Sequence, residues 1–378
     1  MNIKTFLIMM LTIIFIFTID NLSVSVSAGN AANTSAVKGA MGQVVVLVGK
    51  IRVGTIVERN NQKQIVWTQA GKGTYLKSNQ IVYTLAASKC IIRMVDDTKL
   101  TLKPETKLII NSQKLKISGK NKTYSIGVIS GATNIKKGKN STKFSVNTPT
   151  SVCGVRGTKL IVGVSASGDT NIMVYEGKVE VTDAKGKDNE VAVSEKLTLD
   201  LNKDAEAVKA PIEDFVKPGA GLFFQDPKDL DKFMEKGKTE LDKNPEILIT
   251  NINEALDYNY RKAKQVKKEV NELEKEIKSE ITKLGDQLSE NTTKKCVKVD
   301  ELLSAKFNQN EALYEIAQLI ASKNSSNNNI MGIARQCTGI YENTAKMERE
   351  FNDIFVNLDK EIDKFVDQQE YEDYWACF

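Results

Sequence analysis

The sequence predicts a protein in two parts: an all-β domain (a sandwich, a roll or a solenoid) followed by an α-helical antiparallel bundle or coiled coil. Three observations lead to this fold class. The first half is a series of short β-branched runs, the second half carries apolar residues at helical spacing, and a proline-rich stretch separates them. A chain of 378 residues is long enough for two domains of ordinary size.

The predicted β domain covers residues 36–201. Its apolar runs are four to eight residues long, rich in Val, Ile, Thr and Tyr, and separated by turns that contain Gly, Asn, Asp or Lys. In one run, Leu100 and Leu102 alternate with Thr101 and Lys103. Because successive side chains of a strand point to opposite faces, this alternation predicts one buried face and one face in water.

Residues 202–228 separate the two parts. They hold three of the six prolines of the chain and two closely spaced glycines. This composition predicts a linker, or a tail that packs on the β domain. The region 229–378 that follows is predicted to form the helical domain, with a short helix near residues 229–242 ahead of three long ones.

The apolar residues of the helical region recur at helical spacing. In the first long helix they repeat every seven residues over about four heptads, which predicts a packing seam. The seam consists of Leu256, Ala263, Val270, Ile277 and Leu284, with Val266 and Leu273 as companions. It serves either a bundle within the chain or a homo-oligomer, because periodicity does not distinguish the two.

A second helix is expected over about residues 297–322, and a third begins after the polar break at residues 324–329. The polar breaks at residues 291–293 and 324–329 favour a three-helix antiparallel bundle. The apolar side of the second helix is predicted at Leu302, Leu303, Leu313, Ile316, Ala317 and Ile320. The apolar side of the third is predicted at Met347, Phe351, Ile354, Leu358, Ile362 and Phe365.

The N-terminus predicts export. Lys4 precedes an apolar run from Phe6 to Ile19, which is short for a membrane span and suits the core of a signal peptide. The small residues that end at Ala28 form an acceptable cleavage site, so residues 1–28 are predicted to be a signal peptide. The alternative is that the run stays uncleaved as an anchor. We expect the protein in the periplasm or at the cell envelope.

Composition limits the chemistry of the chain. It contains no histidine, which excludes histidine-based triads and histidine general bases. No two cysteines lie close in sequence, so no zinc motif is present, and we expect no metal site, no cofactor and no enzymatic activity. Residues 1–217 carry a net charge of about +13 and residues 218–378 about −8. The basic half suggests an anionic partner, or simply solvated lysines on strand faces.

Six sequence features of the β half resemble the FecR domain, an extracytoplasmic module of ferric-citrate-type regulators. They are Trp67 and the segments 73–76 (GTYL), 84–88 (TLAAS), 96–108 (DDTKLTLKPETKL), 148–158 (TPTSVCGVRGT) and 174–181 (VYEGKVEV). The resemblance covers roughly residues 40–200. It implies a β fold and an extracytoplasmic, non-enzymatic role.

The sequence departs from the FecR pattern in ways that limit this comparison. Cys90 and Cys153 stand where the family has a small residue, and Asp97 replaces a turn glycine. FecR regulators carry an anti-sigma segment before a membrane span, whereas five residues precede the apolar run here. The regulator mechanism is therefore not expected to apply, and the helical half resembles no family that we can name.

The segment 148–158 is the main candidate site, as a ligand loop or as a structural corner. Its candidate residues are Thr148, Pro149, Gly154, Arg156, Gly157 and Thr158. As a ligand loop, it would use the guanidinium of Arg156 to bind a small anion. As a corner, it would point Val152 and Val155 into the core and pin Arg156 to loop carbonyls or to a carboxylate such as Glu176. It is not a P-loop, because the GxxxxGK[ST] arrangement is absent.

The chain has five cysteines, an odd number that leaves at least one thiol free or paired between chains. Cys90 and Cys153 are expected to be small buried residues, or else a disulfide. In the helical half, a bridge between Cys296 and Cys377 is favoured over a bridge between Cys296 and Cys337.

These features together predict an exported, non-enzymatic FecR-domain protein that acts as an envelope-associated binding or signalling adaptor. Its partner would be an envelope protein or an anionic envelope surface, and its helices could form a homo-oligomer. No nucleic-acid partner is expected. The alternative function is a periplasmic domain that senses a small anion near Arg156.

Overall fold

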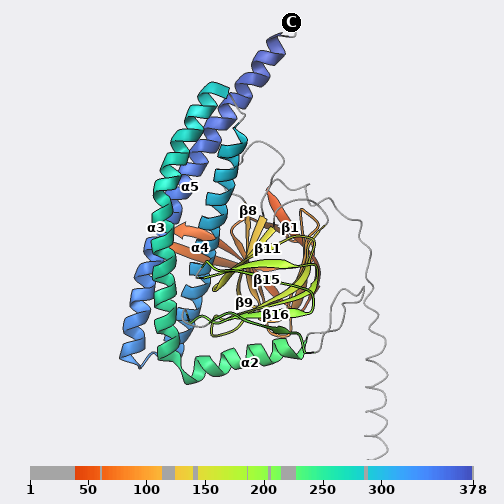
Figure 1. The fold of residues 1–378 in the computed structure, drawn as a ribbon, viewed down its shortest axis with the longest axis vertical. Helices are drawn as coiled ribbons and strands as arrows, with labels where there is room; N and C mark the ends of the chain where they lie inside the picture. Colours follow the sequence, from red (N-terminus) through yellow and green to blue (C-terminus); the bar gives the residue numbers. More distant parts are fainter. Residues whose placement is uncertain are drawn as a thin grey trace, which may run out of the picture.

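The computed structural model confirms the two-part fold class, with strands first and helices after them (Figure 1). It describes residues 39–59, 62–112, 124–138, 144–184, 186–202, 206–213, 227–284 and 288–376. The predicted signal peptide 1–28 and Cys377 lie outside the described residues. Among the described residues, no helix is both long enough and apolar enough to cross a membrane.

The described strands form two layers that share one strand, β9. In the first layer the order is β4–β1–β6–β7–β9–β12–β13–β16–β17, with every pair antiparallel. The strands of this layer are β1 (Ala40–Val48), β4 (Tyr75–Lys77), β6 (Lys89–Met94), β7 (Lys99–Leu102), β9 (Tyr124–Lys136), β12 (Lys159–Val164), β13 (Thr170–Glu176), β16 (Glu195–Leu199) and β17 (Val208–Pro211).

The second layer has the order β3–β2–β5–β8–β9–β10–β11–β14–β15, in which β9 and β10 are parallel and the other pairs are antiparallel. Its further strands are β2 (Ile51–Arg59), β3 (Gln62–Ala70), β5 (Gln80–Thr84), β8 (Lys107–Ser112), β10 (Phe144–Thr148), β11 (Ser151–Val155), β14 (Val179–Asp183) and β15 (Asp188–Val191). Hence the β half is a two-layer structure of the sandwich type.

Strand β9 crosses between the layers at Gly131. Residues before Gly131 pair with β8 and β10, and residues from Gly131 onward pair with β12 and, from Thr133, with β7. Gly131 has φ +83°, and a Cβ added there would lie 2.6 Å from Thr106 Cα. Only glycine fits such a close approach in the left-handed region, so this residue fixes the crossing point.

The main core lies between the two layers, and the outer face of each layer is partly covered by a helix. Helix α2 (Lys228–Lys243) places Leu230 against Ile161 and Met173 of the first layer. Helix α4 (Glu290–Lys323) places Ala312 against Ile81, Ile109 and Ile129 of the second layer. This double coverage explains why β9 and β13 are buried on both sides.

Helix coverage also corrects one expectation from the alternating pattern. Lys103 was expected on a solvated face, but it is only 7% exposed. Burial lowers the pKa of its ammonium group to about 7, with Lys89 acting in the same direction and Asp231 of α2 in the opposite one. The alternation of Leu100 and Leu102, both fully buried, is confirmed.

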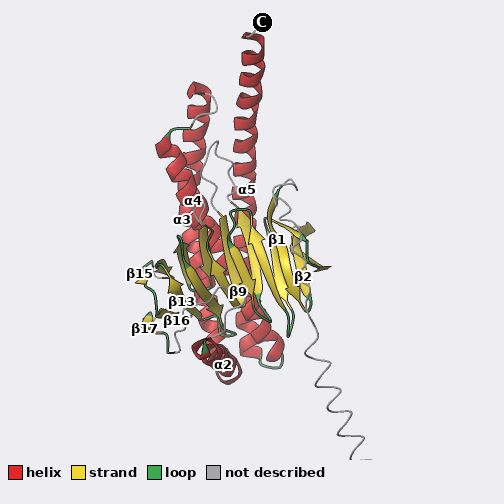
Figure 2. Cartoon of the chain, turned by 90° about the vertical axis from the view of Figure 1, so that its right-hand side faces the viewer, coloured by secondary structure: helices red, strands yellow, loops and turns green. Residues whose placement is uncertain are grey.

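Helices α3 (Pro245–Leu284), α4 and α5 (Asn328–Ala376) form an antiparallel bundle beside the strands, and α5 extends past the ends of the other two (Figures 1 and 2). The predicted seam residues from Leu256 to Ile277 are buried inside this bundle. The seam therefore packs within the chain. The side chains of Leu284, Ile362 and Phe365 lie outside the described residues.

Helix α4 differs from its predicted pattern because it touches the bundle on one side and the strands on the other. Leu302 is 38% exposed, contrary to expectation, while Leu303, Leu313 and Ile320 are buried as predicted. Between the bundle and the second layer, α4 also buries a polar run that periodicity did not indicate. The run comprises Lys306, Asn308, Gln309, Asn310 and Glu311.

Polar contacts join α4 to the second layer. Asn111 Nδ2 donates to Asn308 Oδ1 at 2.8 Å, and Lys107 forms an ion pair with Glu315. The amide of Gln309 also donates to the carbonyl of Ser151, at 3.5 Å. These contacts dock the bundle on the β domain and so position the candidate site.

Part of the predicted linker 202–228 belongs to the sheet. Residues Val208–Pro211 form β17, the edge strand beside β16. Ile212 follows it into the small core under α2. Of the two readings of this segment, the described part fits a tail packed on the β domain.

Candidate ligand groove between the β domain and helix α3

The segment 148–158 consists of strand β11 and the turns on either side of it. Ser151, Cys153 and Val155 of β11 are buried, whereas Val152 is half-buried. The expectation that both valines point into the core is therefore wrong for Val152. The strand alternates, so Cys153 rather than Val152 shares the core face with Val155.

The first turn joins β10 to β11 through Pro149 and Thr150, a two-residue hairpin with Thr148 opposite Ser151. The hydroxyl of Thr148 accepts from the backbone N–H of Ser151 at 3.0 Å and from the hydroxyl of Thr170 at 2.9 Å. These buried bonds hold the turn rigidly, and proline at the first turn position presets its backbone.

The second turn, at Arg156 and Gly157, corrects the predicted role of the arginine. Arg156 is exposed and makes no hydrogen bond or ion pair to a described residue. Glu176, its expected partner, pairs instead with Lys159. The turn depends on glycine, because Gly157 has φ +64°. Gly177, in the turn between β13 and β14, packs against it: this residue has φ +77°, and a Cβ added there would lie only 2.7 Å from Thr158 Cγ2.

Gly154 and Thr158 also have structural settings. Gly154 is exposed in β11, and a Cβ there would meet nothing closer than Glu180 O at 4.0 Å. Thr158 is buried, and its carbonyl accepts from the N–H of Lys137 at 3.0 Å. The six candidate residues therefore occupy two turns and a strand and do not converge on one site.

The described cysteines Cys90, Cys153, Cys296 and Cys337 are free and buried. Cys90 and Cys153 share the main core, and burial raises the pKa of each thiol to about 12. Cys296 and Cys337 lie in different cores of the bundle, so the Cys296–Cys337 bridge is absent. The favoured bridge from Cys296 to Cys377 involves a residue outside the described part of the chain.

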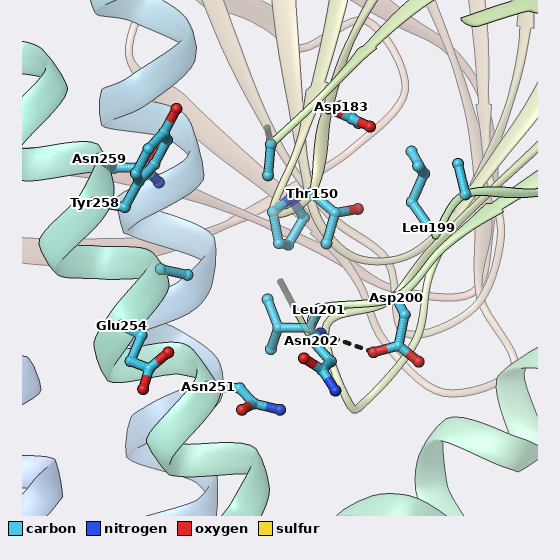
Figure 3. A pocket seen from close by; sticks show the side chains of 14 residues that line it. Thr150, Asp183, Leu199, Asp200, Leu201, Asn202, Asn251, Glu254, Tyr258 and Asn259 are labelled. Atoms are coloured by element: carbon cyan, nitrogen blue, oxygen red, sulfur yellow. Dashed lines mark hydrogen bonds between the residues drawn. The ribbon is translucent and has the colours of Figure 1, made fainter. Parts of the chain in front are cut away.

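The Pro149–Thr150 turn forms part of a groove of about 410 Å³ between the β domain and α3 (Figure 3). This volume lies in the range of small-molecule sites, which often occur between domains. The β wall consists of Pro149, Thr150, Asp183, Ala184, Leu199, Asp200, Leu201, Asn202 and Ala207. The α3 wall consists of Asn251, Glu254, Ala255, Tyr258 and Asn259.

The groove is acidic. Asp183 and Asp200 stand on the β wall and Glu254 on the α3 wall, and none of the described lining residues is Lys or Arg (Figure 3). Behind the β wall, Asp169 accepts from the N–H of Leu201 at 2.8 Å. Burial, together with the nearby charges of Asp200 and Glu240, raises the pKa of Asp169 to about 6.

Two lysines lie near Tyr258, a residue of the α3 wall. The ammonium groups of Lys306 and Lys262 lie 5.5 Å and 5.6 Å from the ring centroid of Tyr258, within cation–π range. Burial, together with the charge of Lys262, lowers the pKa of Lys306 to about 8. Tyr258, a residue of the α3 wall, therefore has two lysine ammonium groups near its ring, although the groove lining itself carries carboxylates.

Of the residues that line this groove, the sequence analysis had named only Pro149 as a candidate site residue. Glu254 and Tyr258 lie one turn apart on α3, away from the heptad seam, where any polar residue fits a solvated face. Residues 251–259 (NINEALDYN) are rich in acidic and amide side chains, and this composition could have marked them as a candidate site. Helix periodicity alone does not show that this face of the helix contacts a turn of the β domain.

Comparison with known protein families supports the resemblance to FecR over part of the chain. Residues 80–180 match the FecR protein family. The FecR segment begins in β5 and ends in β14, and it includes β11 with both of its turns. Trp67 and residues 73–76, which also suggested FecR, precede the matched range.

Other comparisons add little. A search of curated proteins found no match. Two crystal structures of a putative anti-sigma factor from Parabacteroides distasonis, at 2.50 Å and 1.65 Å resolution, are similar to the chain at 16% sequence identity with a TM-score of 0.29. The similarity covers 35% of this chain and 59% of that one.

Proposed function

We propose that this chain is an exported, non-enzymatic adaptor of the cell envelope that acts by binding in a signalling or regulatory assembly. The observation that carries the proposal is the FecR match over residues 80–180, which includes much of both β layers. FecR resemblance implies an extracytoplasmic module that works through partners.

Export is supported by the N-terminal sequence. The basic residue, apolar run and small-residue site within residues 1–28 form the pattern of a secretory signal. The positive charge of the first half suits an anionic partner, either an acidic protein or an envelope surface.

The surface of the β domain supports a binding role. Among the described strands, β3 and β15 end one layer and β17 ends the other, and edge strands present backbone groups with which a partner can pair. Val66 of β3 is 43% exposed and Val208 of β17 is 61% exposed.

We also propose that the protein does not catalyse a reaction. The chain has no histidine, and among the described residues no group of three or more Cys, Asp or Glu side chains forms a metal site. The alternative function, small-anion sensing at Arg156, has less support, because Arg156 does not line the groove beside α3 or two further cavities in the described part of the chain.

Crosslinking in living cells tests the adaptor function. A tagged full-length chain would be treated with a permeable crosslinker, purified under denaturing conditions and analysed by mass spectrometry. We expect a small set of discrete adducts with envelope proteins, crosslinked through residues of the β domain. A variant with Val66→Lys and Val208→Lys should lose or weaken them. A chain without adducts above those of an unrelated exported protein would refute the proposal.

A further inference from the structure

We propose that the outer face of the first β layer binds an acidic polypeptide segment of a partner along a row of four cations. This cation row consists of Arg93 on β6, Lys99 on β7, Lys136 on β9 and Lys159 on β12. The inference rests on the proposed binding function and deepens it, because it names a surface and the chemistry of the partner that fits it.

The strand register places the four cations side by side. Arg93 lies directly opposite Lys99. Lys136 lies between Lys99 on one neighbouring strand and Lys159 on the other. Because adjacent strands are about 4.8 Å apart, the four positions form a line about 14 Å long across the sheet.

The cation row projects from the outer face of the layer. The residue next to each cation is fully buried in the main core between the layers: Ile92, Leu100, Ile135 and Leu160. Since successive side chains of a strand point to opposite faces, the cations point away from that core. Lys136 is exposed and the other three are half-buried. In Figure 2 the strands of this layer lie in front of the long helices, and α2 lies below them.

Stability of the fold does not explain the cation row. Like charges directly opposite each other destabilise a sheet, and the row contains three such pairs in succession. The side chains of Arg93, Lys99 and Lys136 make no hydrogen bond or ion pair to a described residue. Several other lysines of the β domain have carboxylate partners, among them Lys107, Lys178, Lys196 and Lys209. The cation row therefore concentrates positive charge that an anionic partner would neutralise.

The carboxylate is the anion with which this face already pairs. Glu176 on β13 lies opposite Lys159 and forms an ion pair with it at one end of the row. On the same face, Lys196 of β16 pairs with Asp229 of α2, with 3.0 Å between Nζ and Oδ1. A segment rich in Asp or Glu would extend this pairing from Lys159 to the three cations that have no described partner.

The dimensions of the cation row suit an extended segment. An extended chain advances about 3.3 Å per residue, so carboxylates at every second residue recur about every 6.6 Å on one side. Three of them span about 13 Å, close to the length of the row. The neighbouring row of the same face holds no acidic residue that would repel the segment: it consists of Ile91, Thr101, Asn134 and Ile161.

A single segment also fits the burial of the row better than a flat anionic surface does. Arg93, Lys99 and Lys159 are half-buried, and a chain that lies along the row reaches side chains of this kind more readily than a plane of lipid head groups. We therefore assign the surface to a polypeptide, and a lipid surface becomes an outcome of the test.

Fluorescence anisotropy of labelled peptides with the full-length protein at low ionic strength tests the proposal. The probe is a peptide in which Glu alternates with Thr (TETETETE), and its matched control has Gln in place of Glu (TQTQTQTQ). We expect saturable binding of the acidic peptide with a stoichiometry near one, at least about tenfold tighter than that of the control. High salt should weaken it by screening. Equal binding of the two peptides, or no binding of the acidic one, would overturn the proposal.

Variants place the binding on the cation row. Lys99→Gln combined with Lys136→Gln, the row variant, should weaken the acidic peptide at least about tenfold. Lys50→Gln combined with Lys187→Gln removes the same net charge at exposed positions between β1 and β2 and between β14 and β15, and should bind nearly like the parent. A folded row variant that binds like the parent would overturn the proposal.

The melting temperature without peptide gives a second readout, which a purely structural role would move in the opposite direction. The row variant removes like-charge pairs, so it should melt at the same temperature as the parent or higher. A row variant that melts clearly below both the parent and the Lys50→Gln, Lys187→Gln control would show that the cations hold the fold together, and would overturn the proposal.

Two further measurements separate a polypeptide segment of a partner from other anions. Cosedimentation with phosphatidylglycerol vesicles in the absence of peptide binding would assign the cation row to a lipid surface. Salt-sensitive dimerisation of the parent that the row variant loses would assign it to a second copy of the chain. Either outcome overturns the proposal. Failure of the peptide to bind would leave the envelope adducts expected through β3 and β17 unaffected, so this proposal and the adaptor function fail separately.

Discussion

Asn111 in strand β8 and Asn308 in helix α4 are joined by a buried hydrogen bond, 2.8 Å from Nδ2 to Oδ1. The two residues are 197 positions apart in sequence, and each is 7% exposed. Near them, a Cβ on Gly127 would lie 3.3 Å from Asn308 Cβ, so β9 and α4 also approach closely. The bundle is thus part of the packed structure of the β domain, and the predictions below follow from this arrangement.

Replacement of Asn111 by Ala should destabilise the protein by about 1–3 kcal/mol, because it leaves the Oδ1 of Asn308 buried without a donor. Urea unfolding, followed by circular dichroism, measures the change. Asn189→Ala is the control, because the amide of Asn189, at the start of β15, donates to Lys187 O in an exposed hydrogen bond of 3.2 Å. Equal, small effects of the two substitutions would mean that the bundle does not dock through Asn111.

Carbodiimide treatment of the purified protein should join Lys107 to Glu315, because their ammonium and carboxylate groups form an ion pair across the interface. Peptide mapping by mass spectrometry would detect this pair. The ion pair between Lys178 and Glu190, at 2.8 Å on the surface of the β domain, is the positive control. Recovery of the control pair without the Lys107–Glu315 pair would contradict the docked arrangement.

The buried ammonium of Lys103 should make stability depend on pH. Burial lowers its pKa to about 7 in the folded protein, so between about pH 7 and about pH 10 the unfolded chain binds a proton that the folded chain does not. The free energy of unfolding therefore rises with pH over this window. Lys103→Met should raise stability by about 1–3 kcal/mol at pH 7 and much less near pH 10. A gain that is the same at both pH values would show that Lys103 is not buried in this way.

Arg156 of the second turn and Gly177 of the turn between β13 and β14 should respond very differently to alanine. Arg156→Ala should change the free energy of unfolding by at most about 0.5 kcal/mol, because its side chain is exposed without a described partner. Gly177→Ala should cost well over 1 kcal/mol, because residue 177 has φ +77° and its Cβ would lie 2.7 Å from Thr158 Cγ2. Thermal unfolding of both variants measures the difference. A large loss of stability for Arg156→Ala would instead support the predicted role of Arg156, which is to hold the corner together through its guanidinium group.

The sequence predicted those features that depend on local periodicity. The strand alternation at Leu100 and Leu102 and the seam through Val270 and Ile277 appear in the structure because each element buries one face. The prediction failed where an element is covered on two sides. Lys103 lies near a helix that arrives from a distant part of the chain, and nothing in the run around it indicates that contact.

The same limit applies to the candidate site. The motif at residues 148–158 lies within the range that matches FecR, as predicted. Arg156 was predicted to bind an anion or to hold the corner because its guanidinium group suits both roles. In the structure that side chain is exposed on a turn. The groove depends on the approach of Thr150 to α3, a tertiary contact between segments about one hundred residues apart. Periodicity explains the helix and the hairpin separately, and only the folded chain brings them together.

The most direct test of the adaptor function combines compartment and partner in one measurement. Intact cells would be treated with a crosslinker that does not cross the cytoplasmic membrane, and the chain would be compared with a version that lacks residues 1–38. We predict discrete adducts with envelope proteins for the full chain and none for the shortened one. Adducts that form equally without residues 1–38, or a full chain that the reagent never reaches, would contradict an exported adaptor.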